Sequence, residues 1–514
     1  MTVDIGITLG VITLAVILLA LELLSPDVLL LGALGILLAL GVVPLEEGLA
    51  GFSEPTILAI GSLFVVASGL RSTGILRRAA ELLFGGFVSL RAVLLRLVLA
   101  SGISSAFLNN TPIVAMGMSS VLAWTREKEV SASKLLIPLS YASILGGICT
   151  LIGTSTNLVA DGLLREHGFE GLGFFELGLV GVPLAIVGFA YLVLVAPRFL
   201  PDHAELDPEV GLHPEETESE EGKRNVMEIV IPEGSVLADD TVEHADFQGR
   251  YGARVVSIIR HGAEMAGDPE GVVLHRGDTL FLEGHRGSAN ALREEKALLM
   301  VGERAMGAGA AQVPLWRPSA AKAGLFILAL VVVVATTGIL HISVAALLGA
   351  VAMVALKLVT PTEARRSVDW SVLIVIGAAI GLGHALEATG AAVWLGKGIV
   401  ALGAPFGGLG ILATVLFACM FFTLTITNTA AVALIFPVAL SAATSQGLEI
   451  RPFVIAITVG ASLAFATPLG YQTNLMVYGP GGYRFGDFVR AGLPLQTLLA
   501  VLSVILIPVF WPLS

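Results

Sequence analysis

Charged residues are scarce in this chain: Asp, Glu, Lys and Arg make up 14% of its 514 residues, whereas hydrophobic residues make up 55%. A water-soluble fold could not cover so much apolar surface with so few charges. The mean hydropathy is +0.88, and apolar runs of the roughly 17 to 25 residues needed to span a bilayer recur along the sequence. We therefore predict a polytopic membrane protein, with the segment from Asp4 through Leu24 as a retained first span because it lacks a basic leader and a cleavage site.

Other features are absent as well. The two cysteines, Cys149 and Cys419, each lie in an apolar segment, which indicates small buried residues instead of a disulfide or a metal site. The sequence has no phosphate-binding loop, metal motif or nucleophile elbow, so we expect neither an enzyme nor an ATP-driven pump. No basic or aromatic-rich segment points to nucleic acid. The net charge of −12 arises largely from an acidic segment at 202–222 and says little about a substrate.

What the chain does contain is a duplicated pattern. The run SSAFLNNTPIVAMGMSS at 104–120 is interrupted by Asn109-Asn110-Thr111, and TLTITNTAAVALIFPVALS at 423–441 is interrupted by Thr427-Asn428-Thr429. Each is followed by a second interrupted run, LIGTSTNLVADGLL at 151–164 and TPLGYQTNLMVYGPG at 467–481. The offset between the halves is nearly the same at both pairs of clusters. Matched polar interruptions in two apolar halves predict a secondary transporter whose site lies between the repeats.

The apolar segments predict the same plan in both halves. Each half should have three spans, a re-entrant helical hairpin, a broken span and a final span, with hairpins at about 88–126 and 408–445 and broken spans at about 133–165 and 452–478. Five crossings per half invert the second half relative to the first. Positive residues then fall on one side of the membrane, which predicts that both termini lie outside and that the insert between the halves lies in the cytoplasm. We expect the protein in a bacterial-type inner membrane.

The insert differs in composition from the membrane halves. Residues 225–301 alternate in the manner of short strands with Gly-containing turns, which predicts a small α+β module. We expect a first repeat at 1–199, an acidic linker at 200–224, the module at 225–301, a second linker at 302–318 and a second repeat at 319–514.

The polar clusters predict an anion site. A hairpin tip ends one helix and starts another, so the N–H groups beginning at Thr111 and Thr429 are unpaired and carry partial positive charge. Two such ends facing each other suit a ligand with two negative charges. Thr156, Asn157, Thr473 and Asn474 of the broken spans are expected to complete the substrate contacts.

The same clusters predict cation sites. Ser105 stands four residues before Asn109, and Thr423 four before Thr427, so each pair shares one helical face. With the carbonyls of Gly153 and Gly470 at the breaks, they form neutral oxygen cages that suit sodium. No Asp or Glu lies in these clusters, which disfavours a carboxylate proton relay. Asp161, Asp487, His384 and Glu387 are expected at span ends as interface residues.

These residues resemble the divalent anion/sodium symporter (DASS) family of the ion transporter superfamily, and the resemblance covers both membrane halves. That family has Ser-Asn-Thr at each hairpin tip, and here the first residue is Asn109 or Thr427. The resemblance implies substrate contacts from Asn110, Thr111, Asn428 and Thr429, and a homodimer that works by an elevator motion. It also implies sodium sites at Ser105, Asn109, Asn110 and Gly153 in one half and at Thr423, Thr427, Asn428 and Gly470 in the other.

Two further resemblances bear on the substrate. Dicarboxylate carriers of that family often show Thr-Pro-Pro-Asn where this chain has Thr154-Ser155-Thr156-Asn157 and Tyr471-Gln472-Thr473-Asn474. The insert resembles the C-terminal module of regulators of potassium conductance (TrkA-C, or RCK-C), found in members that resemble sulfate transporters. We therefore expect sulfate or a similar oxyanion, with a C4-dicarboxylate as the alternative and a module-regulated channel as a more distant one. Sodium versus proton coupling, stoichiometry and the regulatory ligand of the module stay open.

Overall fold

The structure is a computed structural model that describes residues 3–20, 24–75, 90–128, 130–202, 225–232, 235, 237–260, 263–265, 269–284, 288, 292, 298–305, 317–424 and 426–513. It is mostly helical with one small sheet, which confirms the predicted polytopic helical membrane protein. Within these residues, seven helical segments are long and apolar enough to cross a membrane. Most of the acidic linker and part of the second linker, at 203–224 and 306–316, lie outside the described residues.

Two runs of helices follow one another in the same order. The first comprises α1 (Val3–Ala20), α2 (Pro26–Ala39), α3 (Leu45–Ala50), α4 (Pro55–Ser72), α6 (Leu90–Ser105), α7 (Asn110–Lys128), α8 (Leu136–Gly147), α9 (Ser155–Glu166) and α10 (Gly178–Leu194). The second comprises α14 (Pro318–Thr336), α15 (Ile342–Ala355), α16 (Pro361–Ser367), α17 (Trp370–Ala388), α18 (Ala391–Gly403), α19 (Gly407–Phe422), α20 (Asn428–Ser445), α21 (Ile450–Ser462), α22 (Gln472–Tyr478) and α23 (Phe485–Phe510). Helices α20 and α22 follow α7 and α9 at nearly the same offset along the chain, so the sequence repeat is also a structural repeat.

Local signals explain where many of these helices begin. Proline stands in the first turn of α2, α4, α14 and α16, where its missing N–H costs no hydrogen bond. Thr360 and Glu363 form a capping box at α16. Between α17 and α18, Gly390 has φ +78°, which glycine adopts without strain and which lets the chain turn sharply.

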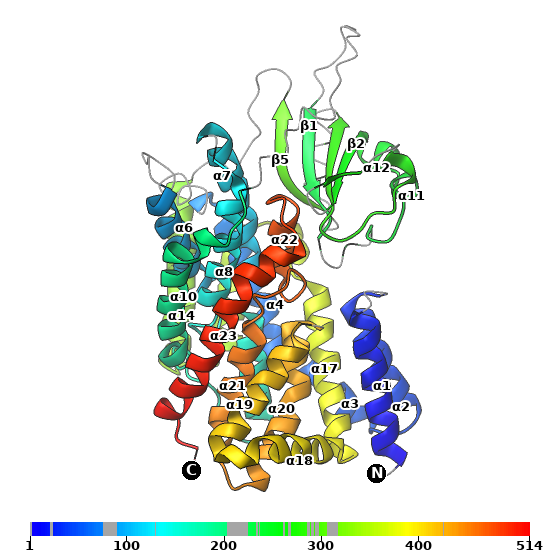
Figure 1. Ribbon diagram of the computed structural model, residues 1–514, viewed down its shortest axis with the longest axis vertical. Coiled ribbons are helices and arrows are strands. Elements are labelled where there is room, and N and C mark those ends of the chain that lie inside the picture. Colours follow the sequence, from blue (N-terminus) through cyan, green and yellow to red (C-terminus); the bar gives the residue numbers. More distant parts are fainter. Residues whose placement is uncertain are drawn as a thin grey trace, which may run out of the picture.

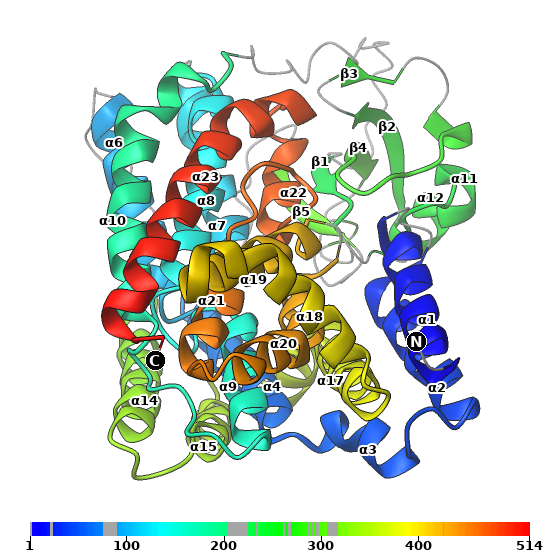
Figure 2. The same cartoon turned by 60° about the horizontal axis from the view of Figure 1, so that its bottom comes forward.

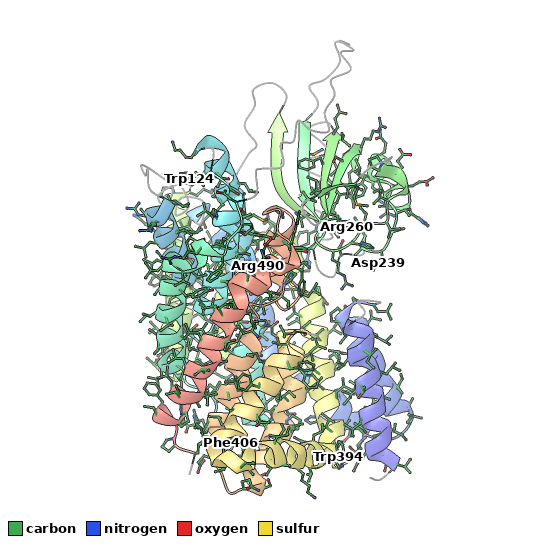
Figure 3. The ribbon with its side chains drawn as sticks, viewed as in Figure 1. Trp124, Asp239, Arg260, Trp394, Phe406 and Arg490 are labelled. Atoms are coloured by element: carbon green, nitrogen blue, oxygen red, sulfur yellow. The ribbon has the colours of Figure 1, made fainter. Side chains whose placement is uncertain are left out.

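The two helical hairpins enter from opposite ends of the molecule. In Figure 1, α6 and α7 stand at the end that carries the sheet, whereas α18, α19 and α20 gather at the other end. Trp394 and Phe406, beside the second hairpin, are labelled at that far end in Figure 3, and Arg490 lies near the sheet end. Trp394 and Phe406 are exposed, at 51% and 79%. Aromatic side chains at one end of a membrane protein suit a membrane–water interface.

All the helices of the two runs except α16 and α18 fall into two groups. The hairpin group comprises the two hairpins, the two broken helices and the helix that follows each broken helix: α6, α7, α8, α9, α10, α19, α20, α21, α22 and α23. The frame group consists of α1, α2, α3, α4, α14, α15 and α17, and both views show α1 and α2 together at one edge of the molecule (Figures 1 and 2). The groups meet where α17 packs on α20 and α4 packs on α9.

Small residues allow close helix packing in the hairpin group. A methyl group on Gly146 of α8 would collide with the carbonyl of Gly102 on α6, and one on Gly492 of α23 would collide with the carbonyl of Phe465. In lipid, where apolar burial does not drive association, such close backbone contact is a main source of helix–helix attraction.

The insert forms one antiparallel sheet with the strand order β3-β2-β4-β1-β5. Its strands are β1 (Asn225–Val230), β2 (Ala253–Arg260), β3 (Ala263–Glu264), β4 (Thr279–Gly284) and β5 (Leu299–Ala305), and two short helices, α11 (Val242–Ala245) and α12 (Phe247–Tyr251), precede β2. A separate hydrophobic core includes Met227, Phe247 and Leu282. Strand β5 continues past the expected end of the module at 301.

The sheet region rests on the hairpin group. Beside Gly277, which has φ +82°, lie the side chains of Leu475 and Tyr478 from α22. A methyl group on Gly479, just past α22, would lie 2.6 Å from Thr279 Oγ1 and 2.7 Å from the Gly277 carbonyl oxygen. The turn before β4 and the end of α22 are thus in direct backbone contact.

Candidate functional site

The tip of the first hairpin is the turn between α6 and α7. Asn110 is the first residue of α7, is 1% exposed, and accepts a short hydrogen bond from the Ser105 hydroxyl through its Oδ1. Its Nδ2 donates to the hydroxyl of Tyr471 at 2.7 Å. The helix therefore begins one residue earlier than expected, and the asparagine joins the tip to the other half of the chain.

The tip of the second hairpin is built differently. Thr427 caps α20, its Oγ1 accepting from the N–H of Ala430 at 3.3 Å. Thr423 Oγ1 and Asn428 Nδ2 both donate to the carbonyl of Ala461, at 2.9 Å and 2.8 Å. This tip is tied to the end of α21 in its own half, so the two matching asparagines have different partners.

The breaks in the two broken helices share one design. Asn157 Nδ2 donates to the carbonyls of Gly147 and Thr150 at 3.0 Å and 2.7 Å. Asn474 Nδ2 donates to those of Ala464 and Thr467 at 2.8 Å and 3.2 Å. The acceptors precede the asparagine at the same two spacings in both halves. A buried carbonyl without a partner is costly, so each asparagine stabilises the open turn between its two helix segments.

This use of the two amides bears on their expected role. An asparagine side chain has two N–H donors, and both donors of Asn157 and of Asn474 are taken by the break carbonyls. Neither has a spare N–H for an anion in this structure. The acceptor atoms differ: Asn474 Oδ1 accepts from Ser140 Oγ of α8 at 2.7 Å, whereas Asn157 Oδ1 is buried without a partner among the described residues.

The first tip also contacts the second break. Thr111 Oγ1 donates to Gln472 Oε1 at 3.0 Å. The Tyr471 hydroxyl, which accepts from Asn110, lies 3.3 Å from Thr154 Oγ1.

Three of the expected substrate residues, Asn110, Thr111 and Thr156, thus belong to one set of contacts between the halves. Thr473 Oγ1 lies 2.9 Å from Ser140 Oγ of α8, and Thr156 Oγ1 lies 3.5 Å from Thr154 Oγ1. Sequence reasoning noted Tyr471 and Gln472 only as departures from a motif and assigned them no role.

The geometry around Gly147 fits the expected first cation site. A methyl group built on Gly147 would lie 2.9 Å from Asn110 Oδ1 and 3.3 Å from both the carbonyl oxygen of Gly153 and Asn110 Nδ2, which donates to the Tyr471 hydroxyl. Two oxygens therefore face the same small space, and the Ser105 hydroxyl adjoins one of them. Neutral oxygens converging on a space that only glycine leaves open suit a small hard cation such as sodium.

The second half does not keep this space. The position matching Gly147 is Ala464, and its methyl lies 2.9 Å from where a methyl on Gly470 would stand. Gly470 N–H donates to Thr467 Oγ1 at 3.0 Å. The two expected cation sites are therefore unequal, and the first has the more open cradle.

Asn109, also expected at the first cation site, borders a second space. It lines a small, largely apolar cavity with Phe64 of α4, Phe107 of the tip and Ser155 of α9. Asn109 is half-buried and adjoins the frame group, whereas Asn110 faces the break. The side chain of Asn109 therefore borders this cavity, and its part in the first cation site stays a prediction.

Two His–Glu pairs join α9 to α17 at the end of the molecule away from the sheet. His384 Nε2 lies 2.9 Å from Glu166 Oε1, and its Nδ1 lies 2.7 Å from the carbonyl of Glu47. His167 Nε2 lies 3.0 Å from Glu387 Oε1. Burial lowers the pKa of His167, but hydrogen bonds to Glu387 and to the Leu163 carbonyl outweigh it, so the net pKa is raised. Sequence reasoning expected His384 and Glu387 at an interface but did not pair them.

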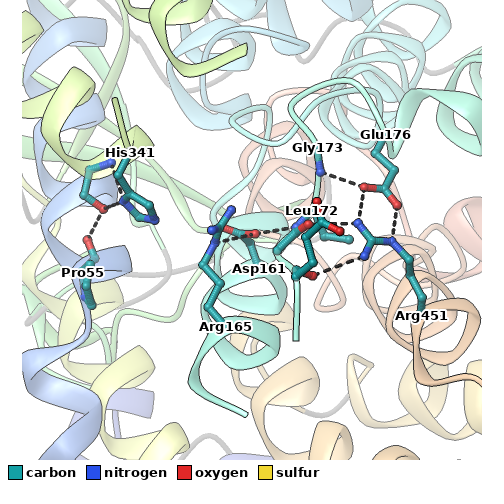
Figure 4. Close-up of polar contacts among 11 residues, drawn as sticks. Pro55, Asp161, Arg165, Leu172, Gly173, Glu176, His341 and Arg451 are labelled. Carbon is teal, nitrogen blue, oxygen red and sulfur yellow. Dashed lines mark hydrogen bonds and ion pairs between the residues drawn. The ribbon is translucent and has the colours of Figure 1, made fainter. Parts of the chain in front are cut away.

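Further ion pairs fix the loops around α9 (Figure 4). Asp161 is 1% exposed and binds Arg165 at 3.0 Å and the N–H of Leu172 at 2.6 Å. Glu176 binds Arg451 of α21 at 2.6 Å. Burial raises the pKa of Glu176, but hydrogen bonds from Arg451 and the N–H of Gly173 outweigh it and lower the pKa overall. Asp161 is therefore an internal structural residue and not a surface one.

Comparison with known proteins agrees with a transporter. The profile of the citrate transporter family, CitMHS, matches residues 16–460. An uncharacterized transporter of Synechocystis is 32% identical, over 98% of this chain and 96% of that protein. An uncharacterized transporter of Escherichia coli is 24% identical, over 92% and 93% of the two chains. Sodium/sulfate cotransporter 1 of Chlamydomonas reinhardtii is 30% identical over 54% of this chain and 31% of its own length.

Proposed function

The chain belongs to the citrate transporter family, and we propose that within it the protein is a sodium-coupled symporter of a small divalent anion, most simply sulfate. The observation that carries this proposal is the meeting of the first hairpin tip with both breaks. Asn110 binds Tyr471, and Tyr471 adjoins Thr154. Polar groups from both halves thus meet in one buried region at the starts of α7, α9 and α22.

The chemistry of this region favours an anion with an accompanying cation. Helix starts and hydroxyl groups attract negative charge, and none of the four polar clusters contains Lys or Arg. Two negative charges in a low-dielectric interior require compensation. Sodium in the Gly147 cradle would supply positive charge next to Asn110, so ion and anion would bind cooperatively.

We assign the residues as follows. Substrate contacts come from Asn110, Thr111, Asn428, Thr429, Thr156 and Thr473, with Asn157 and Asn474 holding the breaks open beside them. Sodium contacts come from Ser105, Asn110 and Gly153 in the first half and from Thr423, Thr427, Asn428 and Gly470 in the second. Asn109 stays a predicted sodium contact of the first half.

The names of relatives favour sulfate over the alternative. Three relatives of 30% identity are named sodium/sulfate cotransporters, one of them as a probable one. The alternative substrate is a C4-dicarboxylate, since the family as a whole is named for citrate. A channel is a weaker alternative, because two inverted hairpins in one chain do not make a symmetric selectivity filter.

The architecture supports a movable hairpin group. We propose that the chain is of the divalent anion/sodium symporter type, that the hairpin group moves against the frame group as an elevator, and that frame helices form a homodimer. The sheet region, which we assign to the TrkA-C type, would lie in the cytoplasm and bind a regulatory ligand. Its contact with α22 gives it access to the moving part.

The test is uptake of radiolabelled sulfate into proteoliposomes, with and without an inward sodium gradient. We expect gradient-dependent uptake that falls about tenfold or more in Asn110→Ala and Asn428→Ala, because each change removes hydrogen bonds to a charged ligand or to the tip. The matched control is Gln446→Ala, which removes an exposed amide at the end of α20. This variant should take up sulfate normally.

Two outcomes would contradict parts of the proposal. Succinate uptake without sulfate uptake would support the symporter but contradict sulfate as its substrate. Equal uptake with and without the sodium gradient would contradict the proposed sodium sites.

A further inference from the structure

Tyr471 occupies a position where the internal repeat is broken. It follows Thr154 at the same offset that relates Asn157 to Asn474. Both residues are helix N-caps with nearly the same extended backbone, φ −144° and ψ 148° at Thr154 and φ −152° and ψ 134° at Tyr471. The backbone is repeated, but one half carries a short hydroxyl side chain and the other a phenol.

The two matching side chains touch. Thr154 Oγ1 and the Tyr471 hydroxyl are 3.3 Å apart. Residues that an approximate twofold axis relates can meet only beside that axis, and an anion bound between the halves would lie there. Tyr471 is 8% exposed, so its ring is part of the interior and is not a surface group.

The hydroxyl is arranged to donate. Because Asn110 Nδ2 donates to it at 2.7 Å, the phenol oxygen already serves as an acceptor and its own proton is left for Thr154 or for an incoming oxygen. A hydroxyl that donates to an ionised acceptor makes a shorter and stronger hydrogen bond than one to a neutral acceptor. The phenol adds this donor without adding charge.

The size of the Tyr471 ring also bears on how long a substrate can be. The ring reaches from the start of α22 to the first tip, and Gln472 beside it accepts from Thr111 at 3.0 Å. This half of the site is therefore closed by side chains that Thr154 and Ser155 in the other half do not match in size. A compact tetrahedral dianion places all its oxygens around one atom, whereas a dicarboxylate separates its two charges along a carbon chain.

From this geometry we infer that Tyr471 determines substrate specificity, donating a hydrogen bond to a compact tetrahedral oxyanion and excluding longer dicarboxylates. The inference rests on the proposed function of the site.

The experiment compares Tyr471→Phe and Tyr471→Thr with the unchanged protein in sodium-driven proteoliposome uptake of sulfate, with succinate as competitor. Tyr471→Phe keeps the ring, so we expect the KM for sulfate to rise about tenfold while succinate still fails to compete. Tyr471→Thr restores the residue of the first half, so succinate should compete and accumulate. Tyr191→Phe is the matched control, since its buried hydroxyl bonds the carbonyl of Ala491 outside the site.

The outcomes separate this inference from the proposed function. If the unchanged protein takes up no sulfate under a sodium gradient, the proposed function fails, and the inference with it. If sulfate uptake is normal but Tyr471→Phe leaves its KM unchanged, or Tyr471→Thr folds with a normal melting temperature and still rejects succinate, the inference alone is overturned. The isosteric Tyr471→Phe change keeps the test decisive should Tyr471→Thr fail to fold.

Discussion

At the scale of single residues, the internal repeat keeps the side chains that bind the backbone at the breaks and varies those that line the proposed sites. Asn157 and Asn474 bind carbonyls at the same two spacings. Gly147 and Ala464 differ by one methyl, and Thr154 and Tyr471 by a ring. The two breaks therefore have the same backbone support but different side chains around them, so the two halves of the proposed site differ.

The Gly147 cradle leads to a prediction about sodium. In Gly147→Ala the new methyl would lie 2.9 Å from Asn110 Oδ1 and 3.3 Å from the Gly153 carbonyl oxygen, filling the space in which the cation would bind. We expect the sodium concentration for half-maximal uptake to rise about tenfold or more, with little change in expression. Sodium titration of uptake at saturating sulfate measures this.

Ala464→Gly is the matched control for that change. It opens the equivalent space in the second half and should leave the sodium dependence equal or stronger. An unchanged sodium dependence in Gly147→Ala would show that the first cradle does not bind the cation.

At the scale of helices, the two His–Glu pairs connect the hairpin group to the frame group. Glu166 and His167 close α9, and their partners His384 and Glu387 lie near the end of α17. Ion pairs across a surface that slides must break for movement to occur. In the proposed elevator, these pairs would therefore stabilise the conformation described here against the others.

The raised pKa of His167 predicts a pH dependence. Its pairing with Glu387 stabilises the fold fully below the unpaired histidine pKa of about 6.5 and is lost as pH rises through the raised folded-state pKa. We expect the melting temperature in detergent to fall as pH rises above about 6.5, and to fall less steeply in His167→Gln.

Glu176→Gln supplies the control for the pH experiment. The pKa of Glu176 is lowered, so its pairing with Arg451 is complete above about pH 4.5 and is lost only in acid. The change should lower the melting temperature by a similar amount throughout the neutral and alkaline range. Parallel curves for His167→Gln and the unchanged protein would exclude the assigned titration.

At the scale of the whole molecule, the sheet region contacts the helix that follows the second break. Thr279 and the Gly277 carbonyl meet Gly479 at the end of α22, and Tyr471 and Asn474 lie at the start of that helix. A short helix transmits a displacement of one end to the other. If a ligand binds the sheet region as proposed, its effect would reach the proposed substrate site through the short helix α22.

This contact gives a prediction for Gly479→Ala. The added methyl, 2.6 Å from Thr279 Oγ1, should push the sheet away without disturbing the helices. We expect faster hydrogen–deuterium exchange in residues 275–284 and in α22, measured by mass spectrometry, with an unchanged melting temperature of the membrane part. Gly486→Ala, which meets nothing within 4 Å, should exchange like the unchanged protein, and equal exchange in both variants would contradict docking through Gly479.

Much of the fold could be predicted because it follows from local composition and from the repeat. The lengths of the apolar runs predicted the helices. The polar clusters predicted both hairpin tips and both breaks, close to where α7, α20, α9 and α22 begin. Strand β5 was missed because Leu299–Ala305 has little alternation to mark it and is a strand only through its pairing with β1.

The sequence by itself determined that this protein lies in a membrane, that it consists of two related halves, and which amides and hydroxyls interrupt them, because these depend on residue type and spacing along the chain. Only the tertiary structure decided which of those groups face one another. Tyr471 of the second half meets Asn110 of the first, His384 meets Glu166 between two helices, and Asn109 and Asn110 have different surroundings although they are adjacent. Such pairings depend on how helices pack, and side-chain spacing along one segment carries no information about the partner segment.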